Sequence, residues 1–195
     1  MTTNKPSTTL IAGGIVFLAI IIALIWTIST YNGLVSRDED VNEKWANVQA
    51  DYQRRADLIP NLVATVQQYT DYEGTVLTEI TAARSGWTQA RTPEQQQAAA
   101  ADMDGALARL LVVVENYPTL QANENYLSLQ DELAGTENRI KLSRTEYNSA
   151  VKTYNQRVRS FPANVIAGMF NFLPRTAFEA ASGSENAPAV DALFA

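Results

Sequence analysis

The apolar residues of this chain form one unbroken run, followed by widely spaced repeats. Residues 10–28 read LIAGGIVFLAIIIALIWTI, nineteen positions without a charge. As a helix this run would rise about 28 Å, close to the ~30 Å hydrocarbon core of a bilayer. A buried core helix is the alternative, but such a helix normally keeps one polar side, and this run is apolar all round. The pattern therefore predicts a transmembrane anchor over residues 10–30, preceded by a short polar tail over residues 1–9.

A cleaved signal peptide is the other interpretation of this run, because only Lys5 and the amino terminus precede it. The segment from Trp26 to Tyr31 carries no pair of small residues at the usual cleavage position. Both aromatic rings stand where amphipathic side chains favour the membrane interface. We therefore expect an uncleaved single-pass anchor. The charges on the two sides are balanced, and the short tail without acidic residues favours a cytoplasmic amino terminus with the main domain outside.

Beyond the run, apolar residues recur at steps of three, four and seven, which mark one face of a helix. The first set comprises Leu34, Val41, Trp45, Val48, Tyr52, Ile59, Leu62, Val66, Tyr69, Leu77 and Ile80. Pro60 removes a backbone donor, so a kink or break is expected near Ile59. One bent helix, or two helices joined end to end, fits this pattern equally well.

A second helix is predicted to begin at Thr92, after a connection over residues 85–91. Thr92 has the character of an N-cap, Pro93 suits the first turn, and Gln95 stands at the capping-box position. The residues expected to face inward are Met103, Leu107, Leu110 or Leu111, and Val114. Pro118 disfavours helical geometry at Tyr117, so this helix should end before it.

A third helix is predicted from about Leu120 to Arg159, some 60 Å in length. Its apolar face comprises Tyr126, Leu133, Ile140, Tyr147, Val151, Tyr154 and Val158. Long helices joined by short turns, with no convincing alternating strand pattern, indicate an all-α protein. We expect an elongated, antiparallel, coiled-coil-like helical bundle over residues 31–180, following the transmembrane helix.

A short apolar segment, residues 164–173, follows this helix and includes Met169, Phe170 and Phe172. It is too apolar for a simple loop and must be buried against something. It would either cap the end of the bundle or contact the membrane surface or a partner. The last stretch, residues 181–195, is rich in small and polar residues and is expected to be a flexible tail.

Composition excludes several kinds of chemistry. The chain has no Cys and no His, which rules out thiolate nucleophiles, Ser-His-Asp triads and metal sites built on those residues. The formal charge is −6, and the 15 Lys and Arg never form a basic run, so nucleic acid is not expected as a partner. We expect no catalytic residue, no cofactor and no metal.

Four strings in order resemble the LemA family of bacterial membrane proteins. They are RRADLIPNLV from Arg54, ENYPTLQANENY from Glu115, ENRI from Glu137 and YNSAVKTYN from Tyr147, followed by Phe161-Pro162. The similarity extends over residues 31–180. It implies an N-terminal anchor, an all-helical bundle and no enzymatic activity. Family members often carry His-Glu where this chain has Tyr72-Glu73, so any role that depends on that His would be absent here.

The polar residues of these strings have two interpretations. Arg54, Arg55 and Asp57, beside Pro60 and Asn61, would either bind an anion or form an internal network that fixes helix register. The carboxylates considered as partners in such a network are Glu115, Glu124 and Glu137. The string Asn116-Tyr117-Pro118, followed by Asn123, suits a corner between helices, where Asn side chains satisfy free backbone groups.

Three functions remain. The favoured one is a non-enzymatic scaffold or interaction module of the bacterial cell envelope, a homo-oligomer anchored in the cytoplasmic (inner) membrane, with an envelope protein as a further partner. The second is an extracytoplasmic sensor or adaptor, which would need an element with two conformations, and the Pro60 break is the candidate. The third is an enzyme using paired carboxylates, but a slender, packed bundle offers little of the cleft that this requires.

Overall fold

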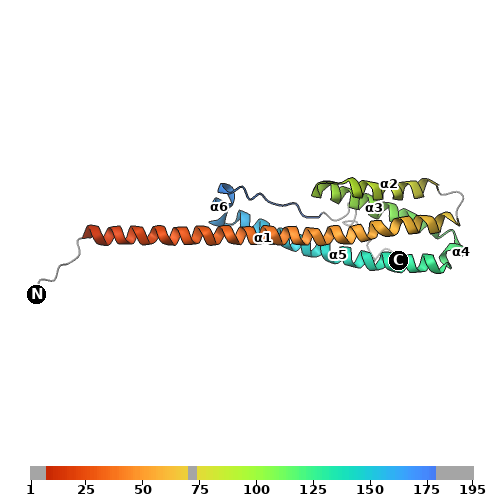
Figure 1. Ribbon diagram of the computed structural model, residues 1–195, viewed down its shortest axis with the longest axis horizontal. Helices are drawn as coiled ribbons and strands as arrows, with labels where there is room; N and C mark the ends of the chain where they lie inside the picture. Colours follow the sequence, from red (N-terminus) through yellow and green to blue (C-terminus); the bar gives the residue numbers. More distant parts are fainter. Residues whose placement is uncertain (1–7, 70–73, 179–195) are drawn as a thin grey trace, which may run out of the picture. The chain divides into compact units, whose positions relative to one another are not determined.

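The computed structural model describes residues 8–69 and 74–178, and within these ranges every regular element is a helix (Figure 1). The helices are α1 (Thr8–Gln67), α2 (Gly74–Gln89), α3 (Pro93–Val114), α4 (Pro118–Gln121), α5 (Glu124–Arg159) and α6 (Ala163–Met169). The all-α prediction is confirmed. The first seven residues of the expected N-terminal tail, Tyr72-Glu73 and the expected tail over residues 181–195 lie outside the described residues.

The chain divides into two compact units. The first unit contains residues 1–43 and 149–176, and the second contains residues 44–148 and 177–195. Helices α1 and α5 each contribute one part to each unit.

The apolar part of α1 is exposed along its length. Its most apolar window of 18 residues has a mean hydropathy of 2.4, and no part of that window is buried within the protein. This exposure argues against the buried-core alternative, because a core helix would be covered by other parts of the described chain. Helix α1 is therefore long and apolar enough to cross a membrane.

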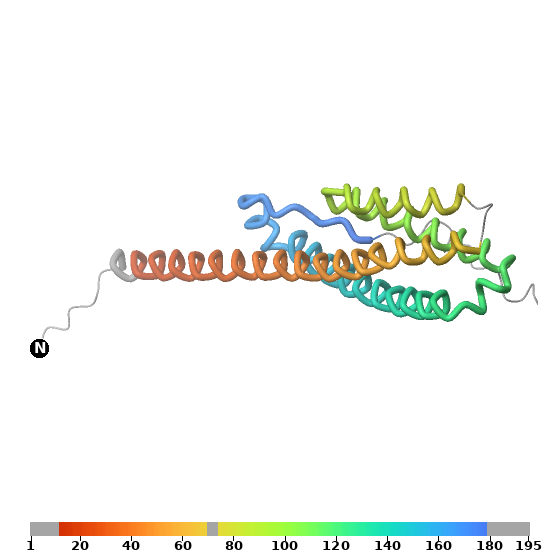
Figure 2. Tube along the Cα trace, turned by 45° about the vertical axis from the view of Figure 1, so that its right-hand side comes forward, coloured from red at the N-terminus to blue at the C-terminus, as the bar shows by residue number. Residues whose placement is uncertain are grey.

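In the first unit, α6 lies beside α1 and the end of α5 (Figures 1 and 2). The buried apolar side chains of this unit are Leu34 and Val41 of α1, Ala150, Val151, Tyr154 and Val158 of α5, and Ala163, Ile166 and Ala167 of α6. Within each helix they lie at helical steps, so each helix presents one apolar face to the others.

After α6 the chain turns and is held by a side-chain amide of α5. Asn171 has φ 59°, a left-handed conformation that asparagine tolerates, and Phe172 N donates to Ala167 O at 2.9 Å, which closes the turn. Asn155 Nδ2 then donates to Arg175 O at 2.8 Å, and Asn155 Oδ1 accepts from Arg175 N at 2.8 Å. The amide thus satisfies both backbone groups of one extended residue, as a neighbouring strand would.

In the second unit, residues 44–67 of α1, α2, α3 and residues 124–148 of α5 lie side by side, successive helices running in opposite directions (Figures 1 and 2). The largest fully buried side chains here are Tyr52, Ile59, Leu62, Ile80, Met103, Leu110, Leu120, Ile140, Val48 and Val66. Burying each such aliphatic side chain contributes about 1.5–3 kcal/mol, so this core supplies the main stabilisation of the unit.

An aromatic cluster completes the second unit. The Tyr52 ring lies 4.9 Å from Trp87 and 6.4 Å from Phe178, centroid to centroid, and Trp45 lies 5.6 Å from Phe178. Asn148 holds Phe178 in place, because its amide donates to Phe178 O at 3.0 Å and accepts from Phe178 N at 2.8 Å. This repeats, on α5, the contact that Asn155 makes in the first unit.

The predicted start of α3 is confirmed. Thr92 Oγ1 accepts from Gln95 N at 3.2 Å, and Gln95 Oε1 accepts from Thr92 N at 3.3 Å, which together form a capping box. The predicted connection over residues 85–91 is too long, since α2 continues to Gln89. Trp87 is buried seven residues after Ile80, so it extends the apolar face of α2 by two turns.

The third predicted helix starts later than expected. Pro118 opens a separate short helix, α4, and Asn123 Oδ1 then accepts from Tyr126 N at 3.0 Å, as an N-cap side chain does. Helix α5 therefore begins at Glu124 and ends at Arg159, the end that was predicted.

Most of the predicted inward positions are buried, with a few exceptions. Leu110 is buried and Leu111 is exposed, which resolves the choice left open between them. Tyr69 is exposed because it lies beyond the end of α1, and Trp45 and Leu133 are half-buried.

Of the two alternatives at Pro60, the break is wrong, because α1 remains helical through Pro60 and ends at Gln67. A bend within the continuous helix stays a prediction. A proline cannot donate to the carbonyl four residues earlier, which here is Ala56 O. Arg84 of α2 donates its Nε to Ala56 O at 3.0 Å and so replaces the missing donor. The long helix is preserved because a neighbouring helix supplies the hydrogen bond that its own backbone lacks.

Candidate functional site

The candidate site in the second unit is a network of charges centred on Arg55. This side chain is only 4% exposed, so its guanidinium requires partners. Nη1 donates to Asp104 Oδ1 of α3 at 2.5 Å, Nη2 pairs with Glu137 of α5, and Nε donates to Thr136 Oγ1 at 3.5 Å. One arginine of α1 thereby contacts two other helices.

A second arginine extends the network. Arg144 of α5 donates to Asp104 Oδ2 at 2.9 Å and to the hydroxyl of Tyr52, which itself donates to the same carboxylate oxygen at 3.1 Å. The Arg144 guanidinium also lies 4.7 Å from the centroid of the Phe178 ring, a cation–π distance. Asp104 therefore accepts from Arg55, Arg144 and Tyr52 together.

Burial governs the electrostatics of this network. Burial raises the pKa of Asp104 and Arg55 lowers it, while the nearby charge of Glu137 also raises it; together they bring this pKa to about 6. Burial also lowers the pKa of Arg144, whose Nε is buried and lacks a hydrogen-bond partner among the described residues. The network thus contains one carboxylate that titrates close to neutral pH.

A hollow of about 570 Å³ lies beside the network, between α3 and α5. Arg55, Asp104, Glu137 and Arg144 form its polar wall. Its apolar wall is formed by Leu107, Ala108, Leu111, Leu133 and Ala134. The charged groups in this wall pair with one another, and these ion pairs join α1, α3 and α5.

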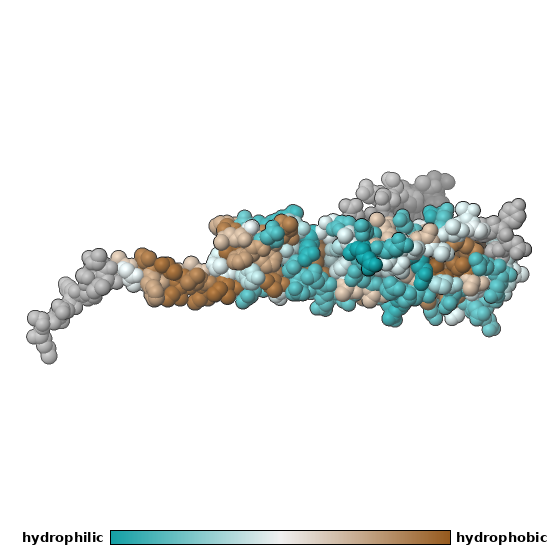
Figure 3. All heavy atoms as spheres, turned by 45° about the horizontal axis from the view of Figure 1, so that its top comes forward, coloured by the Kyte–Doolittle hydropathy of each residue, from teal (hydrophilic) through white to brown (hydrophobic). Residues whose placement is uncertain are grey.

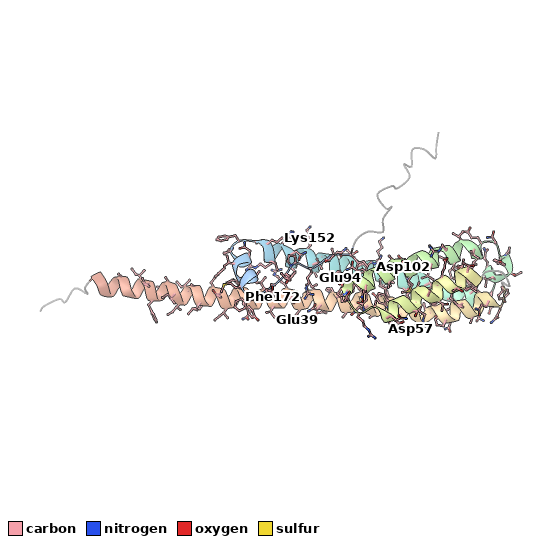
Figure 4. All side chains as sticks on the ribbon, turned by 90° about the horizontal axis from the view of Figure 1, so that it is seen from above. Glu39, Asp57, Glu94, Asp102, Lys152 and Phe172 are labelled. Atoms are coloured by element: carbon pink, nitrogen blue, oxygen red, sulfur yellow. The ribbon has the colours of Figure 1, made fainter. Side chains whose placement is uncertain are left out.

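The other residues of the RRADLIPN string lie apart from this network. Arg54 is exposed and lines a separate hollow of about 250 Å³ together with Glu132 and Arg139. Asp57 lies on the outer surface (Figure 4) and accepts from Gln53 Nε2 at 2.8 Å. Asn61 is also exposed. The two adjacent arginines therefore do not converge on one anion.

The corner residues satisfy helix ends. Asn116 N donates to Val113 O at 3.0 Å, and its side chain approaches the same carbonyl at 3.4 Å. Asn123 caps α5 and also donates to the Tyr69 hydroxyl at 2.8 Å. Pro118 and Tyr117 form the bend between α3 and α4, and Glu115 is exposed at the end of α3. These residues build the corner of the second unit.

The apolar residues Met169, Phe170 and Phe172 belong to the first unit. Met169 and Phe170 are exposed, and Phe172 is half-buried against α1 (Figure 4). The rings of Phe170 and Phe172 lie 4.8 Å and 5.7 Å from that of Tyr31.

Two groups of residues escaped the sequence analysis. Asp104 and Arg144 complete the charge network. Each follows a buried apolar residue by four positions, Ala100 and Ile140 respectively, so each is a charged residue on the inward face of its helix. A charge at such a position is the sequence signal that could have identified them. Asn148 and Asn155 were noted only as part of the string that resembles the LemA family. In the structure the side-chain amide of each forms hydrogen bonds with the backbone of the segment after α6. Nothing in local sequence indicates which distant backbone an amide will contact.

Within residues 8–69 and 74–178, no group of three His, Cys, Asp or Glu side chains is placed to hold a metal ion. The helical fold and the exposed apolar part of α1 define a membrane-associated, all-helical protein with a candidate N-terminal transmembrane helix. Residues 44–192 match the model of the LemA family, and the chain belongs to that family.

Known relatives support this assignment. Magnetosome proteins MamQ 1 and MamQ 2 of Paramagnetospirillum magneticum are each 29% identical over 181 residues, covering 80% of this chain and 66% of each relative. The chain thus spans just under two thirds of the length of these proteins. Protein LemA of Metamycoplasma hominis is 22% identical over 150 residues, covering 76% of this chain and 68% of that protein.

Proposed function

We propose that this chain is a non-enzymatic interaction module of the bacterial cell envelope, anchored by one helix and acting through self-assembly. The supporting observation is α1, in which a fully exposed apolar window continues without a break into residues that build the bundle core. In this proposal residues 10–30 are the anchor and residues 31–180 are the bundle. Cleavage after the apolar run would cut inside a continuous helix, which favours an anchor over a signal peptide.

The proposed absence of enzymatic activity is supported by the pairing of the carboxylates around Arg55. Asp104 and Glu137 both face Arg55, and Asp104 also faces Arg144. These carboxylates form ion pairs that connect helices. Acid–base catalysis instead requires a carboxylate within hydrogen-bonding distance of a substrate.

The sensor alternative loses its main support. It required an element with two conformations, and the Pro60 break was the candidate. Since α1 is continuous through Pro60 and Arg84 donates to Ala56 O, the described residues contain no break in the helix at that position.

Self-assembly is tested by the mass of the full-length protein. After gentle solubilisation, light scattering of the full-length protein is expected to give a discrete multiple of 21.4 kDa. The same measurement on a chain that starts at Asn32 shows whether the anchor makes the contacts between subunits. A monomer in both cases contradicts self-assembly. Persistence of the assembly in the shortened chain would assign the contacts to the bundle.

The membrane side is tested with single cysteines, because the chain contains none. We propose the cytoplasmic membrane with the bundle outside. In intact cells a membrane-impermeant maleimide is expected to label Ser128→Cys, an exposed position of α5, but not Thr3→Cys. Labelling of Thr3→Cys alone would place the bundle in the cytoplasm, and permeabilised cells supply the control in which both sites react.

A further inference from the structure

The outer face of α6 is an apolar surface that nothing in the described chain covers. Ala163, Ile166 and Ala167 face inward, whereas Val165 and Met169 stand on the opposite side. The uncovered set consists of Phe161, Val165, Met169, Phe170 and Leu173. Phe161 is 83% exposed and Met169 is 72% exposed, values that are unusual for large apolar side chains clustered together.

This surface lies at the end of the candidate membrane span. The Tyr31 ring contacts Phe170 and Phe172 at 4.8 Å and 5.7 Å. Tyr31 comes three residues after Ile28, so it lies about 4.5 Å beyond the apolar run along the helix axis. The interfacial layer on each side of a ~30 Å hydrocarbon core is about 5–8 Å thick, so these rings fall within it.

Apolar surface covers the N-terminal part of α1 and the region of α6 (Figure 3). Both belong to the first unit, so their proximity is a property of that unit. Residues 160–174 contain no charge, and Arg159 and Arg175 flank them. Arg175 pairs with Asp38 of α1 at 2.9 Å, and Arg159 is exposed. An uncharged apolar segment with basic flanks is typical of elements that lie in the membrane interface.

We infer that residues 161–173, with α6 at their centre, form a second membrane contact: their apolar face lies in the headgroup layer of the bilayer that α1 crosses. The inference rests on the proposed anchor. Lipid is favoured over a protein partner because the surface is joined through Tyr31 to the end of the span. The contact would restrict the rotation and tilt of α1, since two points of one compact unit would then be held at the membrane.

The test uses the full-length protein in vesicles of phosphatidylcholine and phosphatidylglycerol. A nitroxide is attached to one cysteine at a time, at Met169, Lys152 or Ile22, and its collisions with oxygen and with a water-soluble nickel chelate are measured by electron paramagnetic resonance. Oxygen concentrates in lipid and the chelate in water. The ratio of oxygen to nickel collisions at Met169 is expected to be several-fold above that at Lys152, an exposed position of α5, and below that at Ile22.

Each other outcome is decisive. If Ile22 reports lipid and Met169 resembles Lys152, the inference is wrong and the anchor stands. If Ile22 itself reports water, the anchor fails and the inference fails with it. If Met169 is shielded from both reagents, a protein contact covers α6, and spin–spin broadening would identify a second copy as the partner. That outcome also overturns the lipid contact.

A matched pair of substitutions tests the apolar face directly. With the label at Met169, Val165→Asp is expected to lower the oxygen-to-nickel ratio several-fold, because the carboxylate must stay in water. Asn164→Asp introduces the same charge at the neighbouring exposed position and is expected to change the ratio far less. Equal effects of the two substitutions would overturn the proposed orientation of α6. Circular dichroism of both variants checks that the helices are retained.

Discussion

Replacing Arg55 with methionine is expected to lower the free energy of unfolding by about 3 kcal/mol at pH 8. Arg55 is buried and pairs with both Asp104 and Glu137, whereas methionine keeps much of the side-chain volume without the charge. The substitution leaves two carboxylates facing each other with one cation fewer. Urea unfolding of the full-length protein in detergent micelles, followed by circular dichroism, measures the loss.

The loss should depend on pH in a defined direction. Because burial raises the folded-state pKa of Asp104 from 3.8 to about 6, its ionisation lowers stability as the pH rises through that interval. Arg55 lowers this pKa, so in the methionine variant the interval extends to higher pH. The loss is therefore expected to be smaller at pH 5, where Asp104 carries less charge, than at pH 8.

The control is Arg54→Met, one residue earlier on the same helix. Arg54 is exposed, and removing it is expected to change stability by no more than about 0.5 kcal/mol at either pH. A loss of similar size for both arginines, or a loss from Arg55→Met that does not grow with pH, contradicts the role assigned to the buried network.

The fold could be predicted largely because helical periodicity is a local signal. Val48, Tyr52, Ile59, Leu62 and Val66 all occupy predicted inward positions and are buried. The capping box at Thr92 could also be predicted from the sequence, since its donors and acceptors lie within four residues. The errors arose where distant residues decide the local structure.

Two boundaries show this limit. Helix α1 continues through Pro60, and Arg84, 24 residues later in the sequence, donates to Ala56 O. The residues next to Pro60 in the sequence do not indicate this contact. Helix α2 continues through Gly86 because Trp87 is buried, although the residues from Ser85 read as a connection. Tertiary contacts override local propensity in both places.

The candidate site was predicted only in part. The sequence singled out Arg55 and named Glu137 among three carboxylates, but it also grouped Arg54 and Asp57 with them, and these side chains point elsewhere. Neighbours in sequence on a helix are about 100° apart around its axis, so adjacent charged residues seldom share a site. Asp104 and Arg144 come from other helices, and their pairing requires the packed structure.

The second large effect is expected at Arg84. Replacing it with alanine removes the donor to Ala56 O, which Pro60 leaves without its backbone partner. A charged donor to a partly buried carbonyl contributes about 2 kcal/mol, and the free energy of unfolding should fall by that amount. Urea unfolding under the same conditions measures the change. Arg109→Ala is the control, because its ion pair with Glu79 is exposed and contributes about 1 kcal/mol or less.

The role of Arg84 is separated from ordinary packing by a double-mutant cycle with Pro60→Ala. Alanine at position 60 supplies the N–H that proline lacks, so Ala56 O regains a partner within α1. In this background Arg84→Ala is expected to lower stability by well under 1 kcal/mol, which gives a coupling energy on the order of 1 kcal/mol between two residues that need not touch. An equal loss in both backgrounds would show that Arg84 stabilises the bundle by packing alone. A reduced loss would show that Arg84 keeps α1 continuous by replacing the hydrogen bond that Pro60 removes.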